Sequence, residues 1–222
     1  MKIVTVLRQS QEYKPYHAQW LHRQLEQYDS LCLTDAGEIQ GVNTLPLQYE
    51  WPSWWSKIEV FNPYRADIGS EDILLIDIDT VITGDLTPFL QKRAFTALTD
   101  FYAEGTQNPH MASGLMFIPA EIKHKVWDKF IIEPAHHMQA HIHMPHHGDQ
   151  GFISTCLNAE RWQAVLPGAV VSYKRDVAAK DMPGYHSVRS KGNGMVPENT
   201  RIVCFHGNPR PWRVGLPWIP PL

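Results

Sequence analysis

The sequence has little cysteine, no long apolar stretch and no excess of basic residues. Each of these absences argues against a class of protein. Its three cysteines, Cys32, Cys156 and Cys204, are odd in number and far apart, so they predict neither a disulfide framework nor a zinc-ligand motif. No stretch approaches the roughly 20 apolar residues that a membrane-spanning helix requires. The apolar start of the chain is too short for a signal peptide and is interrupted by Arg8. We therefore expect a cytoplasmic protein with free thiols and no membrane span.

Charge is nearly balanced over the chain but unevenly distributed along it. The sequence has 20 Lys and Arg against 23 Asp and Glu, whereas a protein that binds nucleic-acid polymers usually carries a basic face. Residues 67–85 contain six carboxylates and no Lys or Arg, and residues 174–213 contain eight basic and three acidic residues. This pattern suits a divalent cation that binds beside an anionic ligand, although separate solvated surfaces would also produce it.

The apolar pattern predicts alternating strands and helices. The clearest strand covers residues 72–78, where an uninterrupted apolar run, ILLI, is typical of a strand buried on both faces. The other predicted strands cover residues 2–7, 31–34, 95–99, 114–118, 170–173 and 201–205, and the predicted helices residues 15–29, 53–61, 119–132 and 149–157.

Two segments are predicted as loops. Residues 136–147 are rich in histidine but lack the spacing of a closed zinc site, and residues 181–198 are rich in Gly, Pro and Ser. The chain has no internal repeat and no long linker. It therefore predicts one α/β domain over residues 1–222, with a mostly parallel mixed sheet flanked by helices.

Asp77-Ile78-Asp79 follows the clearest strand. Residues two apart on a strand point to the same face, so both carboxylates can reach one point. A divalent cation with oxygen ligands, Mn²⁺ or Mg²⁺, would relieve their repulsion. Two enzyme classes use such a strand end: haloacid-dehalogenase-like phosphatases, in which Asp77 would be the nucleophile, and metal-dependent nucleotide-sugar transferases.

Four further motifs bear on this choice: SKIEVF at 56–61, SGLMF at 113–117, GDQGFIS at 148–154 and FHGNPRPW at 205–212. Together with the acidic pair, and in this order, they resemble glycosyltransferase family 8, the glycogenin-like enzymes. The resemblance covers about residues 1–213 and implies a GT-A-like (Rossmann-like) fold. It also implies retaining transfer of a hexose from a nucleotide diphosphate sugar, with UDP as the expected nucleotide and Mn²⁺ or Mg²⁺ as cofactor.

The resemblance also assigns residues that bind the cation and the phosphates. Asp77 and Asp79 match the acidic metal-binding pair of the family, and His206 matches its C-terminal metal ligand. Arg210 stands where the family has a Lys that grips the diphosphate, and a planar guanidinium also binds phosphate well. Gly207, beside His206, is expected to contact the donor. The segment from His206 to Arg210 is shorter than in the family.

Other positions match residues beside the transferred sugar. Lys57 corresponds to the basic residue before the acidic strand, and Ser113 and Gly114 to a small pair beside the donor. Asp149 and Gln150 correspond to the pair that holds the sugar, and with Arg210 they are the expected catalytic residues.

The match is weaker near the nucleotide. Thr5 and Tyr13 loosely match the nucleotide contacts after the first strand, and Ile78 is expected to contact the donor between the two carboxylates. The acceptor is left open as a saccharide, a lipid-linked glycan or a protein.

Plainer interpretations remain for some of these residues. Asp149 is also placed to cap its helix, and Trp54 and Trp55 are expected to be core anchors. The phosphatase alternative would need another carboxylate soon after Asp149, and residues 150–158 contain none. A domain that binds nucleotide sugars without catalysis is a further alternative.

Overall fold

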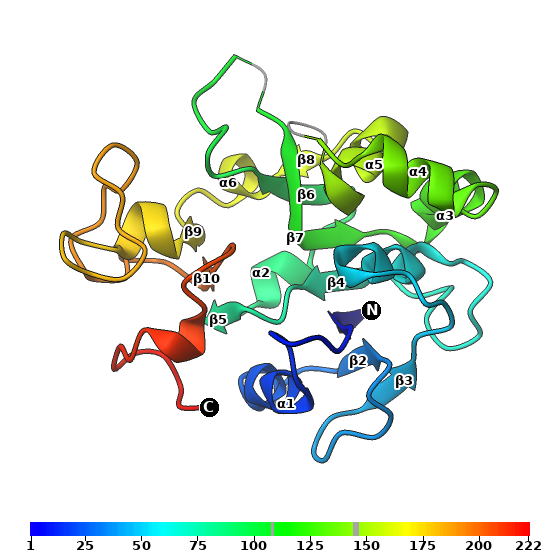
Figure 1. Ribbon diagram of the computed structural model, residues 1–222, viewed down its shortest axis with the longest axis horizontal. Helices are drawn as coiled ribbons and strands as arrows, with labels where there is room; N and C mark the ends of the chain where they lie inside the picture. The colour runs from blue at the N-terminus through cyan, green and yellow to red at the C-terminus, as the bar shows by residue number, and fades with distance from the viewer. Residues whose placement is uncertain (108, 144–146) are drawn as a thin grey trace.

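A computed structural model describes residues 1–107, 109–143 and 147–222, and its centre is a seven-stranded sheet (Figure 1). The strand order is β3-β2-β1-β4-β7-β6-β8. Strands β3, β2, β1 and β4 run parallel, β7 is antiparallel to both β4 and β6, and β8 is parallel to β6. The bounds are β1 (Lys2–Leu7), β2 (Ser30–Thr34), β3 (Thr44–Pro46), β4 (Ile73–Ile76), β6 (Thr96–Thr99), β7 (Met111–Ile118) and β8 (Glu160–Arg161).

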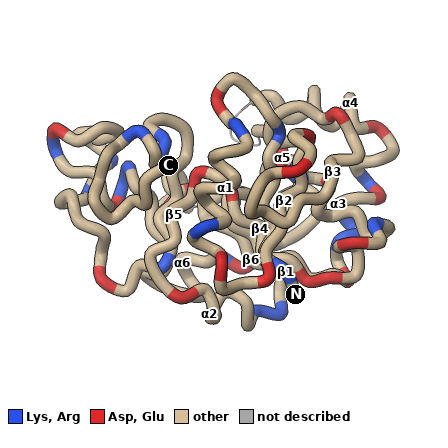
Figure 2. The backbone as a smooth tube through the Cα atoms, turned by 90° about the horizontal axis from the view of Figure 1, so that it is seen from below, with Lys and Arg blue, Asp and Glu red and all other residues tan. Residues whose placement is uncertain are grey.

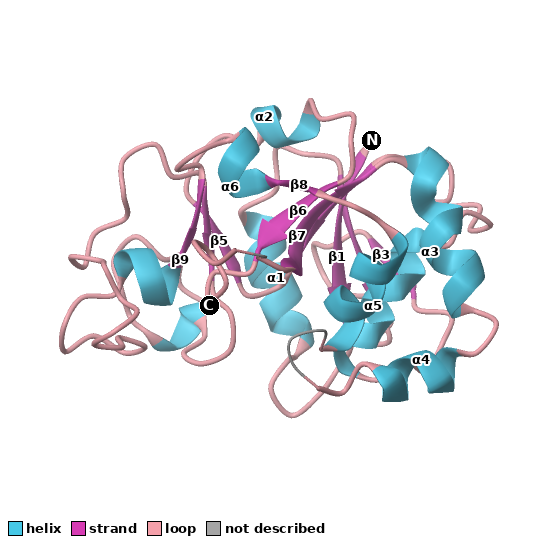
Figure 3. Ribbon diagram, turned by 90° about the horizontal axis from the view of Figure 1, so that it is seen from above, coloured by secondary structure: helices cyan, strands magenta, loops and turns pink. Residues whose placement is uncertain are grey.

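A second, three-stranded sheet has the order β5-β10-β9, with bounds β5 (Thr80–Ile82), β9 (Val170–Ser172) and β10 (Ile202–Cys204). β10 is antiparallel to β5 and parallel to β9. Because β5 begins immediately after Asp79, this sheet brings the late strands of the chain next to the end of β4. Figure 3 shows it on the opposite side of the molecule from α3, α4 and α5.

The helices are short. Their bounds are α1 (Pro15–Arg23), α2 (Thr87–Leu90), α3 (Lys123–Phe130), α4 (Pro134–Ala140), α5 (Gly148–Cys156) and α6 (Trp162–Val165). Short 3₁₀ and π segments complete the set: η1 (Ser53–Phe61), η2 (Ala120–Ile122), η3 (Tyr173–Val177) and η4 (Pro211–Arg213). Among the described residues, no helix is both long enough and apolar enough to cross a membrane.

Two apolar clusters lie on the two faces of the main sheet. Leu74 and Ile76 of β4 belong to the cluster that contains Trp20 and Leu21 of α1, and Ile73 and Leu75 belong to the other cluster. The second cluster also contains the buried apolar side chains of η1, α3 and α5. Successive strand residues point to opposite faces, so a strand covered on both faces needs an uninterrupted apolar sequence. The α/β fold and the buried strand are therefore confirmed.

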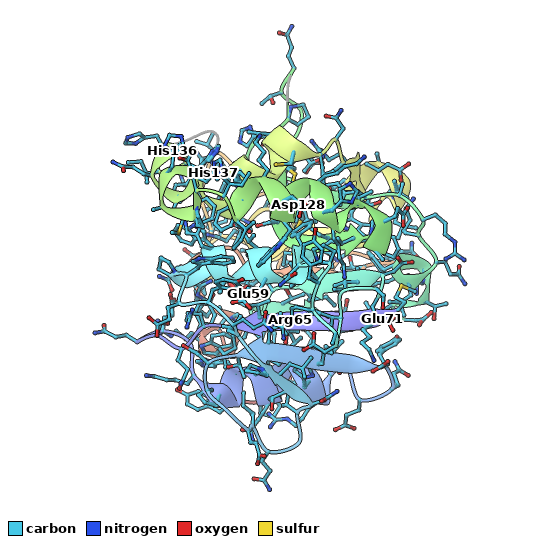
Figure 4. All side chains as sticks on the ribbon, turned by 90° about the vertical axis from the view of Figure 1, so that its right-hand side faces the viewer. Glu59, Arg65, Glu71, Asp128, His136 and His137 are labelled. Atoms are coloured by element: carbon cyan, nitrogen blue, oxygen red, sulfur yellow. The ribbon has the colours of Figure 1, made fainter. Side chains whose placement is uncertain are left out.

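A buried ion pair fixes the far end of η1. Glu59 and Arg65, both labelled in Figure 4, are at most 1% exposed at their side chains, and Arg65 Nη1 lies 3.1 Å from Glu59 Oε2. Glu59 also accepts hydrogen bonds from the backbone N–H groups of Gln48 and Tyr49, at 2.7 and 2.9 Å. Removing one partner of a buried pair costs about 3–5 kcal/mol. The network therefore holds η1 firmly against the sheet.

One predicted boundary is clearly wrong, because the first helix ends at Arg23 and not at residue 29, where a series of turns replaces it. The segment predicted as a helix over residues 53–61 has these bounds, but it is a 3₁₀ helix, and its first residue, Ser53, has a φ of 52°.

The histidine-rich segment is also not a continuous loop. Pro134–Ala140 forms α4, which carries His136 and His137 at the edge of the molecule (Figure 4), while residues 144–146 lie outside the described residues. Asp149 does not cap α5, because that helix begins at Gly148 and Asp149 is in its first turn. The cysteines are free thiols as expected, with Cys32 and Cys204 buried and Cys156 half-buried.

Candidate active site

A cavity of about 660 Å³ opens at the carboxyl ends of β1 and β4. These two strands are parallel neighbours, so their carboxyl ends meet at one edge of the sheet, where open α/β sheets bind ligands. The cavity wall is made by the loop after β1, by η1, by residues 77–79 and by the first turn of α5. Residues 205–207 and Arg210 close it from the C-terminal part of the chain.

Lys57 is the centre of one polar cluster in this cavity. Its Nζ lies 3.2 Å from Asp77 Oδ1, 3.3 Å from Asp149 Oδ2 and 2.9 Å from Ser113 Oγ. Burial disfavours the charged ammonium, but Asp149 and Asp77 outweigh burial and raise the pKa of Lys57. Lys57 therefore stays charged and holds two carboxylates from different parts of the chain.

Beside this cluster, little space is left for a side chain at Gly114. A Cβ on Gly114 would lie only 3.3 Å from Asp77 Oδ2, and the Gly114 carbonyl accepts a 2.9 Å hydrogen bond from the Asp77 N–H. Ser113 is buried, and its hydroxyl accepts a hydrogen bond from Lys57. Gln150 follows Asp149 in the first turn of α5 and lines the cavity, half-buried.

Arg210 is the centre of a second cluster. It donates a hydrogen bond to Asp79 Oδ2, and it donates two more to Glu12, from Nε to Oε1 at 2.7 Å and from Nη2 to Oε2 at 3.0 Å. The hydroxyl of Tyr13 also donates to Asp79 Oδ2, at 3.1 Å, and the Tyr13 ring lies 4.9 Å from the guanidinium carbon. Burial and the charge of Asp77 raise the pKa of Asp79 to about 6, although Arg210 opposes them.

His206 lines the same cavity but is engaged elsewhere. Its Nε2 is hydrogen-bonded to Ser172 Oγ at 2.7 Å, and its ring stacks on Phe101 with 5.3 Å between centroids. Burial, assisted by the nearby Lys174, lowers the pKa of His206 to about 3, so the imidazole is neutral at physiological pH. Within the described parts of the chain, no three His, Cys, Asp or Glu side chains form a group that could hold a metal. A cation on Asp77, Asp79 and His206 therefore stays a prediction.

Of the remaining predicted residues, two line the cavity and one does not. Ile78 and Gly207 line the cavity, and Gly207 has a φ of +71°, which favours glycine. Thr5 is buried in β1, where its hydroxyl is hydrogen-bonded to His22 Nε2 at 2.9 Å, and it does not line the cavity. Its side chain is therefore structural.

Two charged residues at the site were not identified from the sequence. Glu12 lies in the loop after β1, where an isolated carboxylate carries no local signal. Lys174 follows β9, and the parallel register pairs Ser172 of β9 with Cys204 of β10, so Lys174 reaches the same edge as His206. Its Nζ lies 3.5 Å from where a Cβ of Gly207 would be.

The environment of Lys174 is unusual for an ammonium. Burial lowers its pKa, the charge of Arg210 lowers it further, and Asp79 partly compensates. No carboxylate of the described residues forms an ion pair with it. The acidic and basic segments of the sequence therefore meet at this cavity, although Figure 2 shows both signs of charge interspersed over the molecule as a whole.

The arrangement of elements is similar to that of solved glycosyltransferases. An active-site mutant of LgtC in which a glutamine is replaced by glutamate matches 97% of this chain and 91% of its own, with a TM-score of 0.58 and 13% identity. The galactosyltransferase LgtC with donor and acceptor sugar analogs matches 96% of this chain and 89% of its own, with a TM-score of 0.55 and 15% identity. GlyE of Streptococcus pneumoniae matches 96% of this chain and 56% of its own, with a TM-score of 0.57 and 13% identity.

These comparisons establish the fold, a mixed α/β sheet flanked by helices as in GT-A glycosyltransferases. No protein-family model matches the sequence, and no curated protein matches it either.

Proposed function

We propose that this chain, whose fold is that of GT-A glycosyltransferases, transfers a hexose from a nucleotide diphosphate sugar to an acceptor, as family 8 enzymes do. UDP is the nucleotide we propose. The observation that carries this proposal is the cavity at the ends of β1 and β4, where Asp77 is paired with Lys57 and Asp79 with Arg210. A third cation, Lys174, lies beside Gly207 of the cavity wall. Such a mixture of charges suits a diphosphate bound with a divalent cation.

Arg210 and Lys174 are placed to stabilise the leaving diphosphate. Cleavage of the anomeric bond leaves negative charge on the phosphate oxygens, and donors already fixed in position stabilise it without reorganisation. Glu12 holds Arg210 through two parallel hydrogen bonds. The Arg210 guanidinium is therefore already in position before substrate binds. Lys174 has no carboxylate partner among the described residues and can bind a phosphate oxygen without first breaking an ion pair.

The donor set also fits a divalent cation by its chemistry. Asp77 and Asp79 supply carboxylate oxygens, which suit Mn²⁺ or Mg²⁺, and His206 supplies a neutral imidazole nitrogen, which favours Mn²⁺ of the two. When bound, the cation would neutralise charge on the diphosphate. In the structure Arg210 already contacts Asp79 and compensates part of its charge.

The residues around Lys57 are placed to hold the transferred sugar. Asp149 is fixed by Lys57, and Gln150 follows it on the same turn of α5. The LgtC mutant among the structural neighbours alters a glutamine that belongs to the active site of that protein. We assign Gln150 the corresponding place in this chain, beside the anomeric carbon.

The pairing of the carboxylates in the cavity argues against a covalent intermediate in the retaining transfer that we propose. Glu12, Asp77, Asp79 and Asp149 all line it, and each is paired with Arg210 or Lys57. A nucleophilic carboxylate would first have to leave its cation. In our proposal the acceptor hydroxyl attacks the anomeric carbon from the side of the leaving diphosphate. The new C–O bond forms as the C–O bond to phosphate breaks, and the hydroxyl proton passes to the departing phosphate oxygen.

A screen of nucleotide sugars tests the proposal. We expect UDP-hexoses with Mn²⁺ to raise the melting temperature, because a ligand at 100 times its Kd adds about 2.7 kcal/mol of stability. We also expect the protein to hydrolyse the UDP-hexose slowly when no acceptor is present. Asp77→Asn is the matched control and should lose both effects. Absence of binding by any nucleotide sugar, or rapid hydrolysis of phosphate monoesters with beryllofluoride trapped on Asp77, would overturn it.

A further inference from the structure

Two neighbouring tryptophans of η1 have different environments. Trp55 is 6% exposed and packs in the core, stacked on Phe130 with 5.6 Å between centroids. Trp54 is 42% exposed and lines the cavity. The expectation that both are core anchors is therefore wrong for Trp54. A large aromatic side chain left partly open at the wall of a cavity has a surface available to a ligand.

The geometry of η1 fixes where this ring lies relative to the proposed sugar site. A 3₁₀ helix has three residues per turn, so Trp54 and Lys57 lie on the same face, one turn and about 6 Å apart along the axis. Lys57 is the centre of the cluster that contains Asp149. Trp54 therefore lies one turn beyond the residues that we assign to the transferred sugar.

The ring is also held in place by the start of α5. A Cβ on Gly148 would lie 2.6 Å from Trp54 Nε1, so only glycine fits against the indole, and the φ of +68° at Gly148 likewise favours glycine. Gln150 is two residues further along this helix. A ring that loses little freedom on binding is an effective contact surface.

The position of Trp54 points to the acceptor and not to the nucleotide. Arg210, the proposed diphosphate ligand, contacts Glu12 and Tyr13 of the loop after β1. Trp54 instead adjoins Gly148 and, through η1, Lys57. The anomeric carbon carries the bond to the diphosphate, so the acceptor must reach it beside the diphosphate and away from the nucleoside. Trp54 adjoins the residues that we assign to the transferred sugar and is therefore placed to bind such an acceptor.

We propose that Trp54 is the platform of an acceptor subsite and that the acceptor is a saccharide. A pyranose has an apolar face of C–H groups and a polar edge of hydroxyls, so it can cover an indole while one hydroxyl remains directed at the anomeric carbon. Burial of apolar surface supplies binding energy, and the indole N–H is a donor for a ring hydroxyl. This inference rests on the function proposed above.

The test compares Trp54→Ala and Trp54→Phe with wild type, using the UDP-sugar that the wild type hydrolyses. Methyl glucoside, methyl galactoside, lactose and maltose serve as acceptor probes. We expect Trp54→Ala to raise the acceptor KM at least tenfold and to lower the ratio of transfer to hydrolysis, with UDP affinity by calorimetry retained. Trp54→Phe should have an intermediate effect. Tyr64→Ala is the control, because Tyr64 is 74% exposed and lies outside the cavity.

A second measurement does not depend on turnover. With UDP and Mn²⁺ present, the saccharide probe should change the tryptophan fluorescence of wild type and of Tyr64→Ala, and this change should be absent in Trp54→Phe. This fluorescence measurement remains valid even if Trp54→Ala fails to fold, because it does not use that variant.

Different failures have different meanings. Loss of UDP affinity in Trp54→Phe would make the ring a nucleobase platform and overturn this inference alone. Unchanged acceptor KM for every saccharide, or an effect confined to a peptide or lipid acceptor, would also overturn it and leave the proposed function standing. A wild-type protein that binds no nucleotide sugar would overturn both.

Discussion

Glu12 holds Arg210 with two parallel hydrogen bonds, from Nε at 2.7 Å and from Nη2 at 3.0 Å, although the two residues are 198 positions apart. This pair fixes the planar guanidinium and lowers the pKa of Glu12, chiefly through the hydrogen bond from Arg210. A positioned guanidinium loses less freedom when it binds phosphate. The loop after β1 is therefore connected directly to the C-terminal residues of the site.

The first prediction is that Glu12→Gln weakens donor binding. The amide keeps the size of the side chain but loses the charge-assisted bidentate pair, so Arg210 becomes mobile. We expect UDP affinity by calorimetry to fall about tenfold, equivalent to about 1.4 kcal/mol. Glu38→Gln, at an exposed position, is the control. UDP affinity equal to wild type would show that Arg210 needs no positioning partner.

Lys174 gives the second prediction. Its half-buried ammonium reaches Gly207 and lacks a carboxylate partner among the described residues. Lys174→Met should therefore weaken binding of UDP much more than binding of uridine, and should lower kcat because charge on the diphosphate grows in the transition state. Lys180→Met, an exposed residue of the same basic segment, should behave as wild type. Equal losses for UDP and uridine would exclude a phosphate contact.

The local part of the site could be predicted from the sequence. The apolar run of β4 and the short motifs around Lys57, Asp77, Asp149 and Arg210 led to the carboxyl edge of the sheet, and the structure brings these residues into one cavity. Such signals are local because strand burial and motif spacing are properties of a few consecutive residues.

The long-range and steric parts could not be predicted. Nothing near Glu12 indicates a partner at Arg210, and nothing local distinguishes Trp54 from Trp55, since only the packing of η1 on α3 and α5 decides which ring is buried. Thr5 was assigned to the nucleotide, yet its side chain is buried and its hydroxyl is hydrogen-bonded to His22. The three-stranded sheet that precedes Lys174 and His206 pairs β10 with β5, where Ile202 lies opposite Ile82, 120 residues earlier in the chain.

Gln150 gives a third prediction, which separates sugar handling from nucleotide binding. Gln150 lines the cavity beside Asp149, in the first turn of α5. Gln150→Ala should leave UDP affinity within about twofold of wild type and lower kcat by about 100-fold, a loss of about 2.7 kcal/mol in the transition state. A parallel fall in UDP affinity and melting temperature would show a structural role instead.

The fourth prediction concerns stability and pH. Burial lowers the pKa of His22 from 6.5 to about 4, and the ring is hydrogen-bonded to Thr5 and Ser30. The unfolded chain binds this proton more readily, so the stability that His22 contributes is present above pH 6.5 and is lost as pH falls toward 4. One fully shifted group gives a slope of up to about 1.4 kcal/mol per pH unit.

Urea unfolding at pH 7.5 and pH 5.0 measures this effect. His22→Gln should reduce the difference in unfolding free energy between the two values, whereas His186→Gln, at an exposed histidine, should not. His17 and His206 also have lowered pKa values, mainly because of burial, so part of the difference should persist. An identical pH dependence in wild type and His22→Gln would contradict the assignment.

The last prediction concerns competition for Asp79. Arg210 and a divalent cation would compete for the same carboxylate, because Arg210 donates a hydrogen bond to Asp79 Oδ2. Without nucleotide, the cation must displace the guanidinium. With UDP, the diphosphate gives Arg210 another partner and releases Asp79. Mn²⁺ and UDP should therefore bind cooperatively, each improving the affinity of the other by the same factor.

Arg210→Met distinguishes this competition from simple charge attraction. Removing the guanidinium frees Asp79, so Mn²⁺ alone should bind the variant more tightly than it binds wild type, while the coupling with UDP falls. Titration of Mn²⁺ with and without UDP measures both quantities. Asp79→Asn should lose Mn²⁺ binding in both conditions, because it removes the carboxylate for which Arg210 and the cation compete. If Mn²⁺ alone binds Arg210→Met no more tightly than wild type, Arg210 does not compete with the cation, and the cooperativity must arise from the diphosphate alone.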